Sequence, residues 1–382
     1  MTSLMRIPQQ KADELRQKQP GTLTFTLLRL LADGEFHSGE VLARQLGVSR
    51  TGVSNALRGV ATYGLVLYSV RGRGYKLVNP PQWLDARHIV RHLDKLGKFF
   101  QIEILDSATS SNTLLLQRAA PNAAHGRVSG GSVLAVEWQS GGRGRMGRVW
   151  HSGLGSALTF SLLWRFECGL SALSGLSLAA GVALVRALHA LGVQGVGLKW
   201  PNDVMADMKL AQRDTVPLAR LRKRDGERET CGPAGVAKLA GILIEAQGDM
   251  LGPSAVVIGI GMNLSLPQPL ADQIGQPVVN LADIADAPPE RNLLLAVILR
   301  ELHGVLHEFV AHGFAALREE WESYHVWQGQ QVQLRLPDGG SVDGVARGVT
   351  EDGALILETA QGVRKFNVGE VGMRSGSVHV AA

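Results

Sequence analysis

The first 80 residues combine short apolar stripes with capping residues in an order that predicts three helices. Residues 22–32 have the apolar repeat of a helix, and residues Ser38 and Ser49 stand where helix N-caps are expected. Gly47 marks the turn between the second and third helices. One face of the third helix carries the apolar residues Val53, Leu57 and Val60. This helix-turn-helix spacing directs the polar residues of the third helix away from the core.

Two β-prone runs, residues 65–70 and 74–78, follow and predict a hairpin with a basic tip. A hairpin in this place is the wing of a winged helix-turn-helix, and its tip suits contact with a phosphate backbone. The predicted DNA-facing residues of the module, which spans residues 22–80, are Arg50, Thr51, Ser54, Asn55, Arg58, Arg71 and Arg73. A protein-interaction domain with a solvated basic face is the alternative.

Two apolar runs, residues 132–138 and 157–166, predict buried strands on either side of segment 141–150, GGRGRMGRVW. Its glycines match the dinucleotide fingerprint, but that fingerprint requires a helix to follow, and the next run has the aromatic and β-branched content of a strand. We therefore expect a loop whose glycine amides and arginines bind an anion. The alternative is a disordered arginine- and glycine-rich segment that binds RNA.

Four further segments of the central region carry polar groups at the ends of predicted elements. Residues 106–116 predict the end of a strand followed by a capped helix. The first polar residues of that helix are Ser110, Ser111 and Asn112. Residues 199–203, KWPND, place a lysine and an aspartate around a proline turn. Residues 238–245 open an apolar strand with a lysine, and residues 256–264 form another strand that carries an asparagine near its end.

The last part of the chain predicts two amphipathic helices, at residues 291–309 and 314–324, and then a run of short strands. The strands alternate around Asp-Gly turns from residue 330 onward, which indicates a small antiparallel barrel. His303 and His307 have the spacing of a metal-binding pair, but no third ligand is near them in the sequence, so we interpret them as surface histidines.

Composition also indicates the class of protein and its expected cellular location. The 382 residues are 45% apolar and 19% charged, which suits two or three globular domains. Cys168 and Cys231 form no C-x-x-C pattern and the N-terminus lacks a signal-peptide core, so we expect a reducing, cytoplasmic location. Residues 168–185 are uncharged but too rich in serine and glycine for a membrane span, and they predict a buried core helix.

The net charge of +5 is concentrated in the N-terminal module. Residues 1–80 contain 11 Lys and Arg against 5 Asp and Glu, whereas the rest of the chain contains 28 against 29 and is nearly neutral. This asymmetry supports a nucleic-acid-binding module joined to a neutral second part.

The chain resembles the bifunctional biotin protein ligases that also repress biotin synthesis genes, and the resemblance covers nearly the whole chain. The segments that carry the resemblance are, in chain order, Ser49-Arg50, GRGRMGRVW, KWPND and KLAGILIE. This resemblance implies a multidomain α+β fold. The implied domains are a winged helix-turn-helix at residues 22–80, a mixed α/β ligase domain similar to class II synthetases at residues 84–326, and an SH3-like barrel at residues 327–382.

The resemblance also implies a reaction and partners. Biotin would be activated with ATP and Mg²⁺ to biotinyl-5'-AMP, and then transferred to a lysine of the biotin carboxyl carrier protein of acetyl-CoA carboxylase. Operator DNA and a ligand-linked homodimer are the other implied partners, with biotinyl-AMP as effector and no membrane involved.

Individual residues take roles from the same resemblance. The implied biotin-binding residues are Ser110, Ser111, Asn112, Gln139, Arg143, Arg145, Lys238, Gly241 and Leu243. The implied ATP- and adenylate-binding residues are Gly142, Gly144, Gly147, Trp150, Lys199, Asn202 and Asn263. The implied catalytic residues are Arg143, Arg145, Asp203 and Lys238, with Asp203 also at the metal ion. The glycines of the arginine loop are expected to keep it mobile until ligand binds.

The sequence departs from the family pattern in places. Met146 stands where an arginine is common, and Ser111 replaces a threonine. Residues 208–237 form an insertion, which we interpret as a mostly disordered surface segment. It contains Lys209, which begins a second Lys-Leu-Ala sequence like the one that begins at Lys238. Three alternatives stay open: a lipoate or octanoate transferring enzyme, a biotin sensor without catalysis, and a ligase with a vestigial DNA-binding domain.

Overall fold

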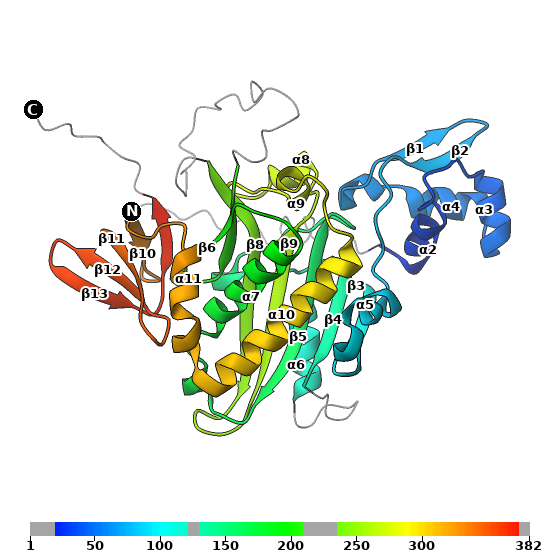
Figure 1. Ribbon diagram of the computed structural model, residues 1–382. Coiled ribbons are helices and arrows are strands. Elements are labelled where there is room, and N and C mark those ends of the chain that lie inside the picture. Colours follow the sequence, from blue (N-terminus) through cyan, green and yellow to red (C-terminus); the bar gives the residue numbers. More distant parts are fainter. Residues whose placement is uncertain (1–19, 121–129, 209–234, 374–382) are drawn as a thin grey trace, which may run out of the picture.

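The computed structural model describes residues 20–120, 130–208 and 235–373. Within these ranges the chain forms a small winged helix module, a large central sheet covered by helices, and a small C-terminal sheet on the opposite side of the central sheet from the module (Figure 1).

The N-terminal module has the predicted order of elements. They are α2 (Thr22–Leu30), α3 (Gly39–Leu46), α4 (Arg50–Leu57), the 3₁₀ helix η1 (Val60–Tyr63), β1 (Leu67–Val70) and β2 (Gly74–Leu77). Both predicted N-caps are confirmed, since the hydroxyl of Ser38 accepts a hydrogen bond from the N–H of Glu40 and that of Ser49 from Gly52. The antiparallel pairing of β1 with β2 makes the predicted wing.

The third helix of the module is shorter than predicted. α4 ends at Leu57, and Gly59, with a φ of 86°, turns the chain into η1. Val60 is buried in the module's core, but it belongs to η1. Arg58 is the C-cap of α4 with extended backbone, so its placement on a face of the third helix was wrong.

The winged helix module packs directly on the central domain. Tyr63 meets Trp138 edge to face at a centroid distance of 5.5 Å, and its carbonyl accepts a hydrogen bond of 2.8 Å from the N–H of Leu154. Arg29 of α2 forms an ion pair with Asp106 of the central domain. Because Trp138 and Leu154 belong to the same buried cluster as the core of the module, the two parts share one apolar interface.

The central sheet has seven strands, and the main apolar core of the protein packs against it. In sheet order the strands are β3 (Gln101–Ala108), β4 (Ser132–Gln139), β5 (Ala157–Phe166), β9 (Ser254–Asn263), β8 (Val236–Gly248), β7 (Asp203–Asp207) and β6 (Val196–Lys199). β3 and β4 are parallel, and the other neighbours are antiparallel. The strands predicted on both sides of the arginine loop are confirmed as β4 and β5, which also excludes the dinucleotide-binding arrangement.

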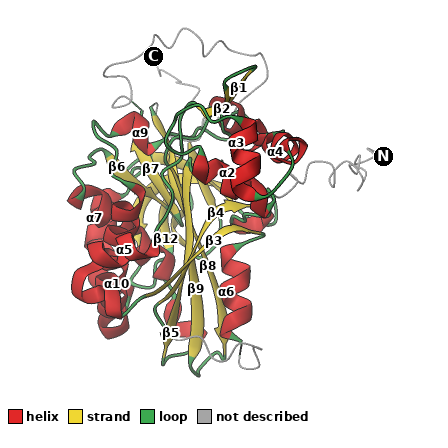
Figure 2. Cartoon of the chain, turned by 90° about the vertical axis from the view of Figure 1, so that its right-hand side faces the viewer, coloured by secondary structure: helices red, strands yellow, loops and turns green. Residues whose placement is uncertain are grey.

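Helices cover both faces of this sheet (Figure 2). One face carries α5 (Ala86–Leu93), α7 (Leu176–Ala190) and α10 (Arg291–His312), and the other carries α6 (Ser111–Ala119). The shorter connecting helices are η2 (Asp94–Lys98), η3 (Arg145–Gly147), η4 (Leu170–Leu173), α8 (Gln268–Ala271), α9 (Leu281–Ile284), η7 (Phe314–Leu317) and α11 (Arg318–Tyr324).

The apolar run predicted as a core helix at residues 168–185 forms α7, which starts later, at Leu176. Gly175, with a φ of 82°, separates α7 from η4. Among the described residues, Leu170–Ala190 is the segment long and apolar enough to cross a membrane. Most of α7 is buried against the sheet and α10, which confirms the prediction of a core helix.

The C-terminal sheet has five antiparallel strands. In sheet order they are β13 (Gly362–Phe366), β12 (Leu355–Thr359), β11 (Ser341–Val349), β10 (Gln331–Arg335) and β14 (Glu370–Met373). Four of them match the predicted runs, and β14 was not predicted. No pairing joins β13 to β14 in the part of the chain that is described, so the strands form an open sheet rather than the predicted closed barrel. β13 is an edge strand whose side chains are mostly exposed.

His303 and His307 pack in an aromatic cluster. Their ring centroids lie 4.4 Å apart, His303 stands edge-on to Phe99 at 4.8 Å, and His307 stands edge-on to Trp164 at 5.4 Å. Burial, together with the neighbouring His307, lowers the pKa of His303. His307 is exposed and His303 is half-buried, so the interpretation as surface histidines holds for His307 and holds in part for His303. The described ranges contain no cluster of three metal-ligating side chains.

A buried ion pair anchors the linker between the module and the central sheet. Glu137 of β4 and Arg291 of α10 are only 1% and 3% exposed, and their side chains meet at 2.8 Å. Glu137 also accepts a hydrogen bond of 2.7 Å from the N–H of Leu84, and Arg291 donates to the carbonyl of Gln82. The pair therefore ties β4, α10 and the linker together, two residues before the end of β4 at Gln139.

Candidate active site

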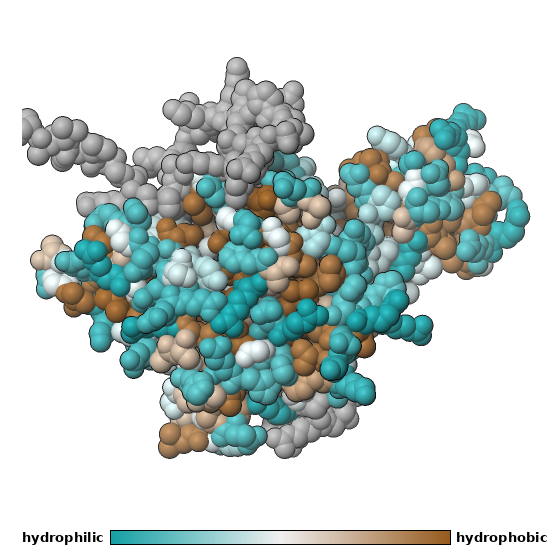
Figure 3. Space-filling model, in the orientation of Figure 1, coloured by the Kyte–Doolittle hydropathy of each residue, from teal (hydrophilic) through white to brown (hydrophobic). Residues whose placement is uncertain are grey.

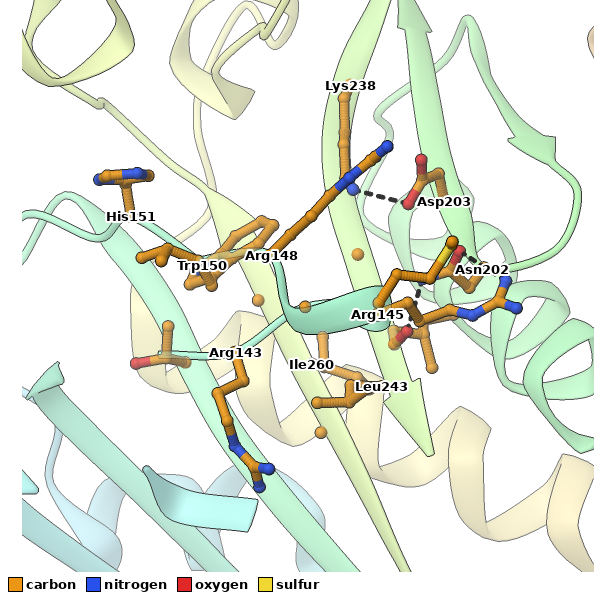
Figure 4. A pocket seen from close by; sticks show the side chains of 18 of the residues that line it. Arg143, Arg145, Arg148, Trp150, His151, Asn202, Asp203, Lys238, Leu243 and Ile260 are labelled. Carbon is orange, nitrogen blue, oxygen red and sulfur yellow. Dashed lines mark hydrogen bonds and ion pairs between the residues drawn. The ribbon is translucent and has the colours of Figure 1, made fainter. Parts of the chain in front are cut away.

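One pocket brings together segments that are far apart in the sequence. It is lined by the start of α6, the end of β4, the arginine loop, the turn between β6 and β7, the middle of β8 and β9, and residues just before and at the start of β14 (Figure 4). The lining includes all of the predicted catalytic, biotin-binding and ATP-binding residues except the two glycines Gly142 and Gly147. The C-terminal sheet contributes through Glu370, which the sequence did not single out.

The start of α6 is fixed by hydrogen bonds with two strands, β4 and β5. Ser110 is the N-cap, and the N–H of Ser111 donates to the side-chain oxygen of Gln139 at 2.8 Å. The hydroxyl of Ser161 of β5 donates to the side-chain oxygen of Asn112 at 2.5 Å and is hydrogen-bonded to the hydroxyl of Ser111 at 2.7 Å. Ser110, Ser111 and Asn112 are each 4% exposed. The structure therefore confirms the predicted cap and adds Ser161, a hydroxyl within an apolar strand, as its support.

The arginine loop is folded as a tight hairpin. The N–H of Trp150 donates to the carbonyl of Gly142 at 2.9 Å, and the N–H of Gly144 donates to the carbonyl of Arg148 at 2.7 Å. A Cβ at Gly142 would lie 2.6 Å from the carbonyl oxygen of Trp150, so this position requires glycine. The amide of Gly144 is thus occupied within the loop in this conformation, and anion binding by the glycine amides of the loop stays a prediction. Mobility before ligand binding stays a prediction.

Trp150 lies on the glycines of the central strands. A Cβ at Gly261 would lie 2.3 Å from the indole, and one at Gly241 would lie 3.3 Å from it. The indole therefore packs where β8 and β9 lack side chains, and the Nζ of Lys238 lies 5.8 Å from its ring. Its Nε1 has no hydrogen-bond partner among the described residues, which leaves a donor in the pocket wall.

Two cations of the pocket, Lys238 and Arg143, are paired with carboxylates. Lys238 of β8 meets Asp203 of β7 at 2.7 Å, and Figure 4 shows this pair on the opposite side of the arginine loop from Arg143. Arg143 extends away from Lys238 and meets Glu245 at 2.8 Å. The structure therefore places Lys238 and Arg143, two of the predicted ligand-binding cations, on opposite sides of the arginine loop.

A third ion pair joins the arginine loop to the C-terminal sheet through Arg148 and Glu370. Burial alone would raise the pKa of Glu370, but the hydrogen bond and charge of Arg148 hold it below its ordinary value. This carboxylate therefore stays ionised at neutral pH. The partners Arg148, Glu245 and Glu370 were missed in the sequence because each pairing depends on tertiary proximity.

Arg145 is the most enclosed arginine of the arginine loop, since Arg143 and Arg148 are exposed. Its pKa is lowered by burial, against the attraction of Asp203 and Glu370. Its guanidinium lies 3.5 Å from the side-chain oxygen of Asn202. The amide of Asn202 donates to the carbonyl of Ile242 at 2.8 Å, so this turn is tied to β8.

Two further predicted ligand-binding residues line the same part of the pocket. Lys199 is 3% exposed and its Nζ lies 5.5 Å from the ring of Trp327. Asn263, at the end of β9, is 2% exposed and donates to the carbonyl of Lys238 at 3.3 Å. The side-chain oxygen of Asn263 has no hydrogen-bond partner in the described ranges, so it offers an acceptor to a bound molecule.

The predicted DNA-facing residues lie far from this pocket, on the winged helix module. All of them are exposed except Ser54, which is half-buried. Arg73, at the wing, stacks on Phe36 at 4.0 Å. This contact holds the cation at the wing against the segment that precedes α3.

Comparison with known proteins agrees with this arrangement. Residues 109–263 match the biotin/lipoate A/B protein ligase family, residues 329–374 match the biotin protein ligase C-terminal domain, and residues 24–76 match a helix-turn-helix domain. The chain is also 33% identical to the bifunctional ligase/repressor BirA of Escherichia coli (strain K12) over 93% of this chain and 98% of that protein. The chain belongs to the BirA family of bifunctional ligase/repressors.

Other relatives of this BirA-family chain support the same assignment. It is 30% identical to the biotin--[acetyl-CoA-carboxylase] ligase of Mycobacterium tuberculosis over 77% of this chain and 96% of that protein. The solved biotin protein ligase from Aquifex aeolicus in complex with biotin and ATP has a TM-score of 0.53 and 24% identity, and covers 72% of this chain and 98% of that one. This structural likeness shows a shared ligase fold.

Proposed function

We propose that the chain activates biotin with ATP and transfers it to a lysine of a biotin carboxyl carrier protein. The observation that carries this proposal is the Lys238–Asp203 ion pair, which lies in one pocket with the arginine loop and the start of α6. Such a site can hold the carboxylate of biotin and the phosphates of ATP together while neutralising their negative charges.

The reaction proceeds in two steps. The carboxylate of biotin attacks the α-phosphorus of ATP, pyrophosphate leaves, and a mixed anhydride, biotinyl-5'-AMP, forms. The amine of the acceptor lysine then attacks the biotinyl carbonyl, an amide bond forms, and AMP leaves with the electrons of the broken bond. The amine loses its extra proton in this step.

We assign roles to the residues that line or support the pocket. For biotin these are Ser110, Ser111, Asn112, Gln139, Arg143, Arg145, Lys238, Gly241 and Leu243. For ATP and the adenylate they are Gly142, Gly144, Gly147, Trp150, Lys199, Asn202 and Asn263. Lys238 stabilises charge at the α-phosphorus, and Asp203 keeps its ammonium oriented. Trp150 covers the adenylate and limits the access of water.

The donor set of the pocket fits a magnesium ion brought in with ATP. Mg²⁺ is usually bound by one or two carboxylates together with substrate phosphates. Asp203 supplies a carboxylate in the pocket wall and is 8% exposed, and the described residues hold no cluster of three metal-ligating side chains that would form an all-protein site. We therefore assign Mg²⁺ to Asp203 and the phosphates, where it would neutralise charge on them.

The winged helix module supports a second function, repression of biotin synthesis genes. A single module reads too few bases for operator specificity, so we infer that a homodimer binds a two-fold symmetric site. We propose biotinyl-AMP as the effector that favours the dimer, because ordering of the loop by this ligand and dimerisation would be linked reciprocally. We also propose a cytoplasmic location, domain bounds of 22–80, 84–326 and 327–382, and an SH3-like C-terminal domain.

Biotin-dependent exchange of labelled pyrophosphate into ATP tests the first half of the reaction without an acceptor. We expect exchange with biotin and Mg²⁺, and none with lipoate in place of biotin. Exchange with lipoate alone would favour the lipoate-transferring alternative of the same fold family.

Replacement of Arg143 with alanine is expected to raise the release of biotinyl-AMP into solution by about tenfold, the effect of losing one charge-assisted hydrogen bond. A filter assay of released adenylate against the ligation rate measures this. Met146→Ala is the matched control, because Met146 lies in the same loop, is 62% exposed and carries no charge. Retention that is equal in the Arg143→Ala variant and the wild type would contradict the role of Arg143.

Replacement of Arg50 with alanine is expected to weaken operator binding by about tenfold and leave ligation unchanged. Arg50 is the first residue of α4, is exposed, and lies outside the pocket. The loss of one phosphate contact should also make the salt dependence of binding less steep. A fluorescence titration of operator DNA at several salt concentrations checks this, and unchanged affinity would remove Arg50 from the interface.

A further inference from the structure

Glu245 occupies an unusual position for a carboxylate on a central strand. It follows Gly241 and Leu243 on alternate positions of β8, and both of these residues line the pocket. Alternation along a strand places the side chains of Leu243 and Glu245 on the face of the sheet that Gly241 leaves open. The side chain of Glu245 is 23% exposed, so it is a partly buried acid next to the residues that line the pocket rather than a solvated surface residue.

Glu245 joins two segments that the proposed function assigns to biotin. Both of its oxygens accept hydrogen bonds from Nη2 of Arg143, at 3.0 and 2.8 Å, and one also accepts from Nδ2 of Asn112 at 3.0 Å. The hydroxyl of Thr113 accepts a further hydrogen bond of 2.9 Å from the same Arg143 nitrogen. The arginine loop and the start of α6 are therefore connected directly through Thr113 and also through the carboxylate of Glu245.

The network continues into the sheet on the other side of Asn112. Its Nδ2 also donates to the carbonyl of Leu243 at 3.1 Å, and its Oδ1 accepts from Ser161 at 2.5 Å. A Cβ at Gly259 would lie 2.2 Å from that oxygen, so the amide is held with little freedom to rotate. Arg143 has no comparable enclosure, since its side chain is 45% exposed. The position of Arg143 consequently depends on Glu245 and Thr113.

We propose that Glu245 is a positioning residue for biotin binding, which fixes Arg143 against the rigid Asn112 amide. This inference rests on the proposed function. All three hydrogen bonds of Arg143 described above use Nη2, so the same geometry leaves the other guanidinium nitrogens oriented toward a polar group of bound biotin beside the start of α6. Without the charge of Glu245, the exposed side chain would sample many rotamers, and ordering it again would cost binding free energy.

Two substitutions at Glu245 separate positioning from packing. Glu245→Gln keeps the size of the side chain and an oxygen that can accept from Asn112, but it removes the charge that holds Arg143. Glu245→Asp keeps the charge and shortens the side chain. We expect the glutamine variant to weaken biotin binding by about tenfold and the aspartate variant to weaken it less, because hydrogen bonds to charged groups are the stronger ones. A residue that only filled space would show the reverse order.

The decisive experiment is a double-mutant cycle on the full chain, with biotin affinity measured by isothermal titration calorimetry. In the Arg143→Ala background, Glu245→Gln should weaken binding by less than about twofold, because coupled residues are not additive. Glu103→Gln is the matched control, since Glu103 pairs with Arg118 away from the pocket. Additive effects of Glu245→Gln and Arg143→Ala would overturn the inference and leave the proposed function intact. A wild-type chain that binds no biotin would overturn both.

Discussion

Replacement of Lys238 with alanine is expected to lower the rate of biotinyl-AMP formation by a factor on the order of 10²–10³, the usual effect of removing one preorganised charge at a reacting centre. Lys238 lies on β8 with its ammonium 2.7 Å from Asp203, at a fixed point of the pocket wall. The loss should fall mainly on kcat, because the ammonium would stabilise charge that develops at the α-phosphorus. Single-turnover formation of biotinyl-AMP measures it.

Lys209 provides a matched control for Lys238. It begins a second Lys-Leu-Ala sequence, in the insertion, and it lies outside the described residues. The described residues on either side of the insertion meet, since the N–H of Met208 donates to the carbonyl of Gly235 at 2.5 Å. The strands β7 and β8 therefore pair antiparallel directly on either side of the insertion. We expect Lys209→Ala to keep the wild-type rate. If Lys209→Ala abolished adenylate formation and Lys238→Ala did not, the assignment of the catalytic lysine to Lys238 on β8 would be wrong.

Replacement of Glu137 with alanine is expected to lower the free energy of unfolding by about 3–5 kcal/mol, because it leaves the cation of Arg291 buried and unpaired. The side chains of Glu137 and Arg291 are 0% and 4% exposed. The substitution also removes the acceptor for the N–H of Leu84, so the linker loses an anchor to β4. Urea unfolding followed by circular dichroism measures the change.

The exposed Glu103–Arg118 pair is the control for this stability effect. Its side chains are 45% and 29% exposed, so Glu103→Ala should cost only about 0–1 kcal/mol. Equal stability losses for Glu137→Ala and Glu103→Ala would show that the buried pair is not a main anchor of the linker.

The local chemistry of the chain explains why much of the fold could be predicted. Ser38 and Ser49 cap helices wherever their hydroxyls can reach free amides, and Gly47 takes a left-handed conformation at the predicted turn. These effects depend on a few neighbouring residues, so they can be read from the sequence. The end of α4 was misplaced because Gly59 interrupts an apolar stripe that continues without a break in the sequence.

The parts that could not be predicted depend on contacts between distant segments. Glu245 and Glu370 lie about 100 and 220 residues from their arginine partners, and only the folded sheet brings them together. Closure of the C-terminal strands likewise depends on the relative position of β13 and β14. One sequence feature could have indicated Glu245, which is that a charged residue follows Gly241 and Leu243 on the pocket-facing positions of an otherwise apolar strand.

Mass spectrometry of an acceptor protein tests the central claim most directly. The full chain is incubated with Mg²⁺ and ATP, a biotin carboxyl carrier protein, and either biotin or lipoate. We predict that one lysine of the acceptor gains a biotinyl group, that omission of ATP prevents this, and that lipoate is not transferred. Transfer of lipoate without transfer of biotin, or an acceptor that stays unmodified with both, would contradict the proposed ligase function.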